Sequence, residues 1–272
     1  MELSIIIVTH NSANVIEECL VSILNNLVNI VYEIIVVDNN STDKTLEILS
    51  NFEYNRFTIV KNKQNVGFAK ANNLGFRKAT GEFILILNPD VIFDKKTDIK
   101  ILINELDKNE NVAIVAPKLI YENGLLQESA RSFPNPLVLF IRGFNLGKFF
   151  NRYEFYKNYF LSDSNDNYPR EVDWVIGAFI LIKKNLLIKV NYFDEKFFMY
   201  YEDADLCLRL LRNGYKTLYF PAITVTHKYK RESAKKLFSV LKMYHIKSIL
   251  RFYIKHFSYL FFGKTRSKYF MP

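Results

Sequence analysis

Polar side chains stand directly after three short apolar runs in the first 90 residues. They are the segments Thr9-His10-Asn11, Asp38-Asn39-Asn40 and Asn88-Pro89-Asp90. Further along the chain come an acidic cluster, Glu202-Asp203-Ala204-Asp205, and His227. Carboxylates combined with an imidazole suit a divalent cation and a general base. These residue types therefore point to a polar ligand, a metal ion and a proton transfer.

The elements that must position these groups alternate along the first 120 residues. The sequence predicts strands over Ser4–Val8, Glu33–Val37, Phe57–Val60, Phe83–Leu87 and Val112–Ala116. It predicts helices from Ser12 to about Asn25 and over Asp43–Ser50, Ala69–Ala79 and Ile99–Asp107. This order implies an α/β fold with a mostly parallel central sheet and helices on both faces. Ligands of such sheets bind outside the carboxyl ends of the strands, where the three polar segments stand.

The second half of the chain is less regular. Residues 121–172 show little periodicity, whereas Val175–Ile182 predicts one further buried strand, in which Gly177 suggests a close backbone approach. A helix over Asp203–Asn213 and a strand over Lys216–Phe220 follow. A structural interpretation of the polar residues stays open here. Asp and Asn are common in turns and caps, and acids are favoured at a helix start such as that of Asp203.

The net charge of +9 is concentrated in the C-terminal tail. Residues 228–272 hold 12 of the 37 basic residues and one acid, a net +11, whereas the first 227 residues carry −2. The tail also holds 11 of the 41 Phe and Tyr residues, which disordered basic arms lack. Lys247, Arg251 and Lys255 would form one basic stripe on a helix. The tail is expected to lie on a membrane surface; the alternative is packing on the body or a second subunit.

Several familiar sites are missing. There is no GxGxxG, no GxxxxGK[ST] and no GxSxG, which excludes a dinucleotide loop, a P-loop and a nucleophile elbow. Cys19 and Cys207 form neither a metal-binding pair nor a disulfide framework. The start of the chain lacks a signal peptide, and no apolar run reaches the ~20 residues of a spanning helix. We expect a cytoplasmic protein, peripheral at the inner face of the plasma membrane, with no nucleic-acid partner.

Taken together, the motifs resemble glycosyltransferase family 2. The segments IIIVTHNS, EIIVVDNNSTD, NVGFAKANNLG and ILILNPDV follow the family pattern in their order and approximate spacing. WVIGAFILIKK, FDEKFFMYYEDADLCLRL and the histidine after YFPAITVTH extend the resemblance over roughly residues 3–230. Within the family the chain is similar to bacterial rhamnosyltransferases that build surface polysaccharide, and ESARSFPNP adds to this similarity. The resemblance implies a GT-A fold and an inverting transfer of a sugar from a nucleotide donor.

The resemblance also implies donor-side roles for individual residues. Those expected at the donor are Thr9, Asn11, Asp38, Asn65, Gly67, Asn73, Asn88 and Asp90. Asp38 would hydrogen-bond the base or ribose; its structural alternative is a cap near Ser41. Asn88-Pro89-Asp90 takes the place of the DXD motif, whose last carboxylate binds Mg²⁺ or Mn²⁺, and His227 would complete the metal shell. A cation there stabilises the charge that gathers on the departing diphosphate.

The same comparison implies the groups that act on the acceptor. Asp203, with Glu202 as the alternative, would take the proton of the acceptor hydroxyl as that oxygen attacks the anomeric carbon. Trp174 and Gly177 would lie beside the acceptor sugar, although a lone Trp is often simply part of a core. Arg131 lies in the acceptor-side stretch and would meet a phosphate, or else stand in solvent.

The expected organisation is a GT-A domain over residues 1–230 followed by an amphipathic helical segment over 231–272. The expected function is transfer of a sugar, with rhamnose favoured by the resemblance and galactose, glucose or N-acetylated sugars open. The acceptor would be a glycan or a lipid-linked saccharide in surface polysaccharide synthesis. Two other functions stay open at this point: a nucleotidyltransferase that acts on a sugar phosphate, and a degenerate binding protein, which Asn88 in place of an acid would fit.

Overall fold

The apolar runs of the first half form the centre of a β-sheet. The computed structural model describes residues 2–52, 54–94, 97–144, 146–160, 168–228 and 240–262. Its strands are β1 (Leu3–Thr9), β2 (Tyr32–Asp38), β3 (Phe57–Lys61), β4 (Phe83–Leu87), β5 (Val91–Ile92), β6 (Val112–Ile120), β7 (Ala130–Arg131), β8 (Arg170–Val172), β9 (Trp174–Val175), β10 (Phe179–Lys183) and β11 (Lys216–His227). Its helices are α1 (Ile16–Asn26), α2 (Thr45–Ser50), α3 (Phe68–Phe76), α4 (Ile99–Lys108), α5 (Pro136–Gly143), α6 (Gly147–Phe150), α7 (Glu154–Lys157), α8 (Lys184–Lys189), α9 (Glu202–Arg212) and α10 (Val240–Phe262).

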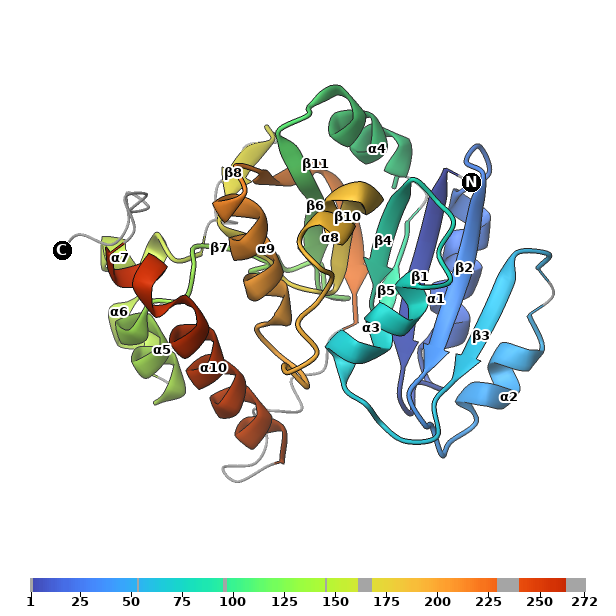
Figure 1. Cartoon of the computed structure of the whole chain (residues 1–272), viewed down its shortest axis with the longest axis horizontal. Coiled ribbons are helices and arrows are strands. Elements are labelled where there is room, and N and C mark those ends of the chain that lie inside the picture. Colours follow the sequence, from blue (N-terminus) through green and yellow to red (C-terminus); the bar gives the residue numbers. More distant parts are fainter. Residues whose placement is uncertain are drawn as a thin grey trace.

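The main sheet has the order β3-β2-β1-β4-β10-β6-β11-β5, with β8 paired to β11 (Figure 1). Strands β3, β2, β1 and β4 are parallel to one another, and β6 is parallel to β11. Strand β10 lies antiparallel between β4 and β6. The predicted α/β architecture with a parallel core and helices on both faces is confirmed, and β10 is the strand that joins the two parallel groups.

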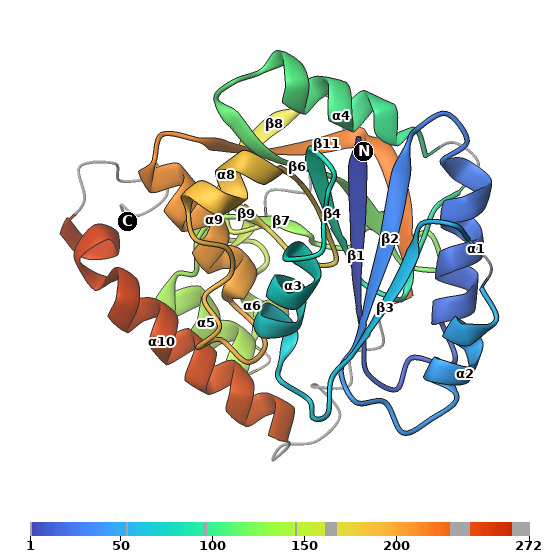
Figure 2. The ribbon, with the colours of Figure 1, turned by 45° about the vertical axis from the view of Figure 1, so that its right-hand side comes forward.

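Alternating residues of the central strands build two cores, one on each face of the sheet. Ile6 and Val8 of β1 belong to one core, and Ile5 and Ile7 belong to the other. Helices α3, α8 and α9 cover the first face, and α1, α2 and α4 cover the second (Figure 2). Because successive side chains of a strand point to opposite faces, a run of β-branched residues fits a strand covered on both sides.

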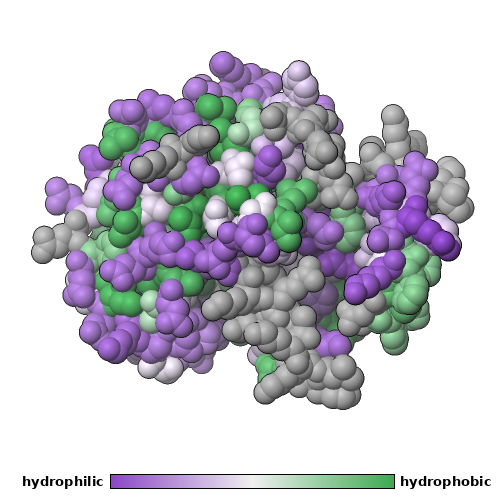
Figure 3. All heavy atoms as spheres, turned by 180° about the vertical axis from the view of Figure 1, so that it is seen from behind, coloured by the Kyte–Doolittle hydropathy of each residue, from purple (hydrophilic) through white to green (hydrophobic). Residues whose placement is uncertain are grey.

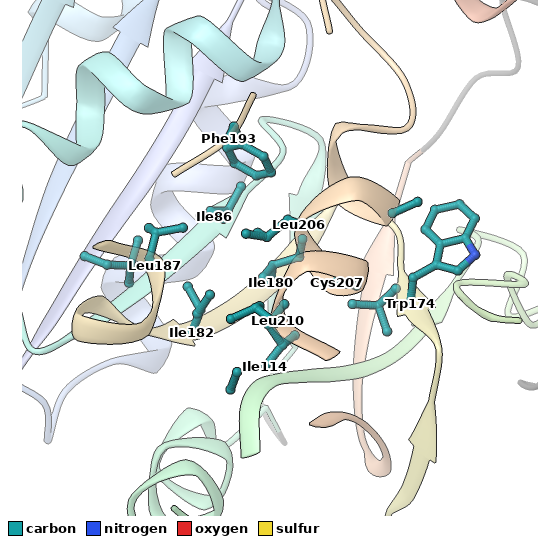
Figure 4. Packing of buried hydrophobic residues seen from close by; sticks show 14 of the residues in the cluster. Ile86, Ile114, Trp174, Ile180, Ile182, Leu187, Phe193, Leu206, Cys207 and Leu210 are labelled. Carbon is teal, nitrogen blue, oxygen red and sulfur yellow. The ribbon is translucent and has the colours of Figure 1, made fainter. Parts of the chain in front are cut away.

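Helix α9 is fixed by one of these cores. Its residues Leu206, Cys207 and Leu210 pack toward Ile180 and Ile182 of β10 (Figure 4). Each is at most 1% exposed, and complete burial of such a side chain contributes about 1.5–3 kcal/mol. This packing fixes the position of α9 and therefore of its first turn, which carries Glu202 and Asp203.

Several element boundaries differ from the predictions. The single strand expected over Val175–Ile182 is divided into β9, which pairs with β7 in a small separate sheet, and β10. Strand β11 continues past Phe220 to His227, because an irregularity between Phe220 and Thr224 restores its pairing with β6 after Pro221, which has no N–H. The first helix begins at Ile16 rather than Ser12, whose hydroxyl accepts the His10 N–H at 3.2 Å.

Helix α10 packs against the body through contacts that run from Tyr244 to His256. Phe252 is fully buried, and the Tyr253 hydroxyl donates to the Pro134 carbonyl at 2.6 Å. The predicted basic stripe is correct in its spacing, but two of its members face the body. Arg251 and Lys255 form ion pairs with Asp194 at 2.7 and 2.8 Å. The boundary expected at residue 230 lies outside the described residues and stays a prediction.

Candidate active site

The carboxyl ends of β1, β2 and β4 meet at one edge of the sheet. Thr9 and Asp38 are register partners in the paired strands β1 and β2, and Asn88 follows β4. The N–H of Asn88 donates to the Ala178 carbonyl at 2.9 Å, which brings the link between β9 and β10 to the same edge. The three polar strand ends singled out in the sequence are thus neighbours.

Asp38 is buried and bound within its own loop. Its Oδ1 accepts from the hydroxyls of Thr9 (3.0 Å) and Ser41 (2.5 Å), and its Oδ2 accepts the N–H of Ser41 at 3.0 Å. Asn11, in the left-handed region at φ 53°, receives the N–H of Thr42 on its side-chain oxygen. The two loops that follow β1 and β2 are therefore held together as one rigid surface.

Asn39 organises the next loop, a role the sequence did not single out. Its Nδ2 donates to Asn65 Oδ1 at 2.8 Å, and its Oδ1 accepts the Val66 N–H at 2.9 Å. Asn65 Oδ1 also accepts the Gly67 N–H at 3.0 Å. Gly67 has φ +86°, and a Cβ there would lie 2.4 Å from the Phe198 carbonyl oxygen. Only glycine fits at this contact between the loop before α3 and the loop before α9.

Asn73 is expected at the donor, and its amide is engaged by a more distant loop. Its Nδ2 donates to the carbonyl of Phe193 (2.9 Å) and to Glu195 Oε1 (3.1 Å), and its Oδ1 accepts the Phe193 N–H at 3.1 Å. These contacts join α3 to the segment after α8. Asn73 therefore supports the site from behind, and direct contact with a donor stays a prediction.

Asp90 and His227 come together across β5 and β11. His227 Nε2 lies 3.1 Å from Asp90 Oδ1 and 3.5 Å from the Asn88 amide, and its Nδ1 lies 2.7 Å from Gln127 Oε1. A proton on Nδ1 would be donated to Gln127, which leaves the Nε2 lone pair facing a carboxylate. Two acceptors at this distance require a proton or a cation between them. Gln127, 100 residues from His227, gave no signal in the sequence.

This donor set suits Mg²⁺ or Mn²⁺ only in part. A carboxylate oxygen and an imidazole nitrogen 3.1 Å apart match neighbouring ligands of an octahedral ion, since bonds of about 2.1 Å at right angles place ligands ~3 Å apart. Among the described residues, no group of three His, Cys, Asp or Glu side chains gathers. The protein thus offers an incomplete shell of the kind that substrate phosphates complete.

Asp203 lies in the first turn of α9 and faces the same edge. Its Oδ2 accepts the Gly177 N–H and its Oδ1 accepts the Ala204 N–H, both at 2.8 Å. A Cβ on Gly177 would lie 3.3 Å from the Phe68 ring and 3.7 Å from Asp203 Oδ2. Gly177 therefore allows the close approach of α3, the β9–β10 link and the carboxylate, which the sequence predicted from a glycine within an apolar run.

The two neighbouring acids differ in their surroundings. The pKa of Asp203 is raised from 3.8 to about 6. Burial is the largest cause and raises it, and the two N–H donors and the charge of Arg131 offset part of that increase. Burial raises the pKa of Glu202 well above its usual range, and the charge of Asp203 raises it further. One oxygen of Glu202 is buried without a hydrogen-bond partner. Of the two acids, Asp203 therefore has the lower pKa and loses its proton first.

A strained turn precedes these acids, and α10 contacts it. Tyr200 and Tyr201 have φ values of 72° and 65°, in the left-handed region that bulky residues seldom adopt. The Ser248 hydroxyl of α10 donates to the Met199 carbonyl at 2.8 Å, and the His245 ring lies 5.1 and 5.4 Å from the rings of the two tyrosines. Two consecutive residues in this region cost of order 1–3 kcal/mol each, so the turn depends on its neighbours.

Asp205, the third acid of the cluster, points away from the edge. It is fully buried and bonded to Arg209 Nε (2.7 Å), Lys255 Nζ (2.6 Å) and His256 Nε2 (2.8 Å). Its carboxylate therefore joins α9 to α10 rather than facing a ligand. This matches the structural role that acids at a helix start were expected to allow.

Trp174 and Arg131 lie side by side near Asp203. The Trp174 indole N–H donates to the Ser132 carbonyl at 2.8 Å, and its ring stacks with Tyr201 at 6.3 Å. Trp174 is buried, so its core role is evident and a sugar contact stays a prediction. Arg131 is half-buried over the Trp174 ring at 5.3 Å, and its Nε donates to the Glu128 carbonyl. The expectation of a freely solvated arginine is therefore not met.

Comparison with known proteins agrees with this geometry. The family model described as Glycosyl transferase family 2 matches residues 4–204. The chain is 31% identical over 259 residues to "Rhamnosyltransferase WbbL" of Escherichia coli strain K12, covering 91% of both chains. It is 26% identical over 208 residues to "N-acetylglucosaminyl-diphospho-decaprenol L-rhamnosyltransferase" of Mycobacterium tuberculosis H37Rv, covering 71% of this chain and 66% of the relative.

Solved structures share the fold at lower identity. A mannosyltransferase from Pyrobaculum calidifontis, solved with GDP-Man and Mn²⁺, superimposes with a TM-score of 0.60 at 18% identity, covering 94% of this chain and 64% of that one. The TarS fragment of S. aureus comprising residues 1–349 gives a TM-score of 0.58 at 20% identity, covering 84% and 60%. The family match spans nearly the whole sheet and both candidate acids. The chain therefore belongs to glycosyltransferase family 2, whose members are inverting glycosyltransferases.

Proposed function

We propose that the chain transfers rhamnose from a nucleoside diphosphate sugar to a hydroxyl of a lipid-linked saccharide during surface polysaccharide synthesis. One observation carries the chemical part of this proposal. A buried carboxylate with a raised pKa, Asp203, lies at the same sheet edge as the Asp90–His227 pair. The choice of sugar rests on similarity to relatives named as rhamnosyltransferases.

The donor would lie across the carboxyl ends of β1, β2 and β4. Asp38 has a second acceptor position on Oδ2, which suits a ribose hydroxyl or a base N–H. Thr9 and Asn11 hold the loops that form the floor of this site, and Asn65 and Gly67 shape its wall. The diphosphate would then extend toward Asn88 and Asp90.

Asp90 and His227 would hold a divalent cation, with Gln127 fixing the imidazole tautomer. When bound, that cation would neutralise the charge of the diphosphate as the bond to the sugar breaks. Asn88 supplies an amide where a second carboxylate would add charge. The protein's own charge at this site is correspondingly small, so metal affinity should depend strongly on the nucleotide.

Asp203 would act as the general base. Two backbone N–H donors, from Gly177 and Ala204, fix the carboxylate without neutralising it. The acceptor oxygen attacks the anomeric carbon, its proton passes to Asp203, and the bonding electrons leave with the diphosphate. This direct displacement inverts the anomeric centre and needs no second nucleophile. Burial and the charge of Asp203 raise the pKa of Glu202 well above its usual range, which disfavours its ionised form.

The acceptor side would face a membrane surface. Five residues of α10 form an outward apolar stripe that is at least half exposed: Met243, Ile246, Leu250, Ile254 and Phe257. Leu137 and Phe140 of the adjacent α5 are also exposed, as is Phe144 directly after it, and with that stripe they form what we call the apolar face. Figure 3 shows hydrophobic side chains at this end of the molecule, on the right. Exposed apolar clusters of this size mark interaction surfaces.

The sequence around α10 favours an anionic bilayer as the partner of that face. Residues 229–239 and 263–272 flank the helix and carry seven Lys and Arg but a single acid. Each basic residue near an anionic leaflet contributes about 1 kcal/mol. No described helix is both long and apolar enough to span a bilayer. We infer peripheral association at the inner face of the plasma membrane, with the apolar face rather than the Arg251 side toward the lipid.

The membrane proposal is tested by sedimentation with vesicles of phosphatidylglycerol and phosphatidylcholine. The double variant Leu250→Glu with Ile254→Glu should lose most of its binding to the anionic vesicles. The matched control carries Val28→Glu and Val31→Glu together, which places the same two charges at similarly exposed apolar residues elsewhere on the surface. Vesicle binding of the double variant equal to that of the control would show that the apolar face does not contact lipid.

The transferase proposal is tested by donor hydrolysis and ligand-induced melting shifts across a panel of nucleotide sugars, with Mg²⁺, Mn²⁺ or EDTA. A metal-dependent response to dTDP-rhamnose is expected. A response to another donor alone would replace rhamnose and leave the mechanism in place. The absence of any response from folded protein, with and without a lipid-linked acceptor, would overturn the proposal.

A further inference from the structure

Two arginines beyond the base are left without an acidic partner. Arg131 of β7 and Arg142 of α5 are each half-buried. Within the described part of the chain, neither guanidinium forms an ion pair with a carboxylate. Nη1 of Arg142 is buried and makes no hydrogen bond. A buried cationic donor without an acceptor is costly, so an acceptor is expected to come from elsewhere.

The two side chains are close neighbours. The backbone of Arg131 bridges to that of Phe160, and the Arg142 guanidinium lies over the Phe160 ring at 5.0 Å. The charges of both arginines act on Tyr201 and His245. Aromatic rings occupy the faces of the two guanidiniums. The five N–H donors of a guanidinium lie in its plane, so these rings cover the faces and leave the edges to other partners. At those edges Arg131 Nε donates to the Glu128 carbonyl, whereas Arg142 Nη1 has no hydrogen-bond partner.

The pair lies on the acceptor side of the reaction. Along this sheet edge the strands follow in the order β2, β1, β4 and β10. Asp38 ends β2, Thr9 ends β1, Asn88 follows β4 and Gly177 precedes β10. Arg131 comes next, because β7 pairs with β9 on the far side of Gly177. The charge of Arg131 reaches Asp203 but the donor loops lie on the other side of the base. An anion at this pair would therefore belong to the acceptor.

The pair also lies beneath the apolar face. Val138 and Arg142 are one turn apart on the inner side of α5, and Val138 is 1% exposed. Leu137 and Phe140 project from the outer side of the same helix, and Phe144 follows directly after it. A helix is about 10 Å across, and an interfacial helix sinks about 5–10 Å into the headgroup region. The Arg142 guanidinium would then stand at the depth of lipid phosphates.

We propose that Arg131 and Arg142 bind the diphosphate of a lipid-diphosphate-linked acceptor, whose prenyl chain lies along the apolar face. The inference rests on the proposed function and specifies the acceptor of the same site. Arginine suits this role because its planar fork binds phosphate oxygens in pairs. The diphosphate would hold the acceptor sugar next to Asp203 while its lipid stays in the bilayer.

The test uses the full chain and geranyl diphosphate as the probe. Trp174, the single tryptophan, lies 5.3 Å from the Arg131 guanidinium, so its fluorescence should report binding. We expect saturable binding of geranyl diphosphate and none of geraniol. Arg142→Gln and Arg131→Gln should each raise the dissociation constant about tenfold or more, because each removes charge-assisted hydrogen bonds. Calorimetry repeats the titration without relying on the fluorescence of Trp174.

The matched control is Arg152→Gln, which removes an exposed arginine that also lies over an aromatic ring, that of Tyr153 at 5.0 Å. It should bind geranyl diphosphate like the wild type. Equal affinity of wild type, Arg142→Gln and Arg131→Gln, all shown to be folded by circular dichroism, would overturn the proposal. The proposal would also be overturned if the two arginine variants lost binding to phosphatidylglycerol vesicles but still bound geranyl diphosphate like the wild type. That result would assign the pair to lipid headgroups instead.

Donor hydrolysis separates this proposal from the proposed function. Arg142→Gln should hydrolyse the nucleotide sugar at the wild-type rate while the KM for the acceptor rises. Wild-type hydrolysis without geranyl diphosphate binding would refute only the arginine site. If the wild-type protein hydrolyses no nucleotide sugar at all, the transferase proposal itself is refuted.

Discussion

Asp203 should give sugar transfer a rate that rises with pH between 5 and 7. The base accepts a proton only when ionised, and burial raises its pKa from 3.8 to about 6. With that pKa, about a tenth of the molecules carry the ionised base at pH 5 and about nine tenths at pH 7, an increase of roughly tenfold in rate. An ordinary aspartate would already be almost fully ionised at pH 5, and the rate would be nearly flat.

The assay is initial transfer rate against pH at saturating donor, acceptor and metal, with the wild type, Asp203→Asn and Glu202→Gln. Loss of the base should lower the rate by about 10²–10⁴ and abolish the rise with pH. Glu202→Gln should keep the rise near pH 6, because the rise belongs to the ionisation of Asp203. Circular dichroism and melting confirm that each variant is folded.

Two results would refute this reasoning. Asp203→Asn with more than a tenth of the wild-type rate would remove Asp203 as the base. A pH dependence that disappears in Glu202→Gln and persists in Asp203→Asn would transfer the role to Glu202. A third variant refines the magnitude: Arg131→Gln should move the rise to higher pH, since the charge of Arg131 lowers the pKa of Asp203.

Three further predictions concern the metal, the glycine contact and the docked helix. Asp90→Asn and His227→Ala should each raise the Mn²⁺ concentration for half-maximal donor hydrolysis about tenfold, and a titration equal to that of the wild type would remove the residue as a ligand. Gly67→Ala should destabilise the fold by about 1–3 kcal/mol in urea and raise the KM for donor, because φ is +86° and the new Cβ would meet the Phe198 carbonyl; unchanged stability and KM would contradict this contact. Asp205→Asn should lower the free energy of unfolding by about 3–5 kcal/mol, because Arg209, Lys255 and His256 would lose the buried carboxylate that they contact. Burial raises the pKa of Asp205, but hydrogen bonds and charges lower it further overall, so its stabilisation is present above about pH 4 and is lost on acidification; the wild type, but not the variant, should lose that contribution in urea titrations below pH 4.

Local pattern was sufficient for the central sheet and the position of its ligand edge. The β-branched runs require burial on both faces, and parallel strands bring their carboxyl ends together, so Asp38 and Asn88 were predicted to lie at the same sheet edge. Asp203 needed the family resemblance, because its spacing from the strands carries no positional information. Gly177 was recognisable as a close approach since it interrupts an apolar run.

Contacts made between distant segments were not accessible in this way. Gln127 and His227 are 100 residues apart, and neither shows a pattern that would pair them. The spacing of Arg251 and Lys255 correctly predicted a shared helix face. It did not predict that both side chains form ion pairs with Asp194 of the body. Charge spacing states which residues lie together on a helix, and tertiary packing decides what they meet.

The contacts of α10 with the turn before Asp203 have a consequence for protein engineering. The family match ends at residue 204, yet Ser248 and His245 brace the turn, and Phe252 packs on Tyr201. A chimera that joins this catalytic half to the C-terminal helix of a relative would exchange the brace along with the apolar face. Acceptor range and turnover would then change together, unless the residues on the inner side of the helix are transplanted as a set with the turn they hold.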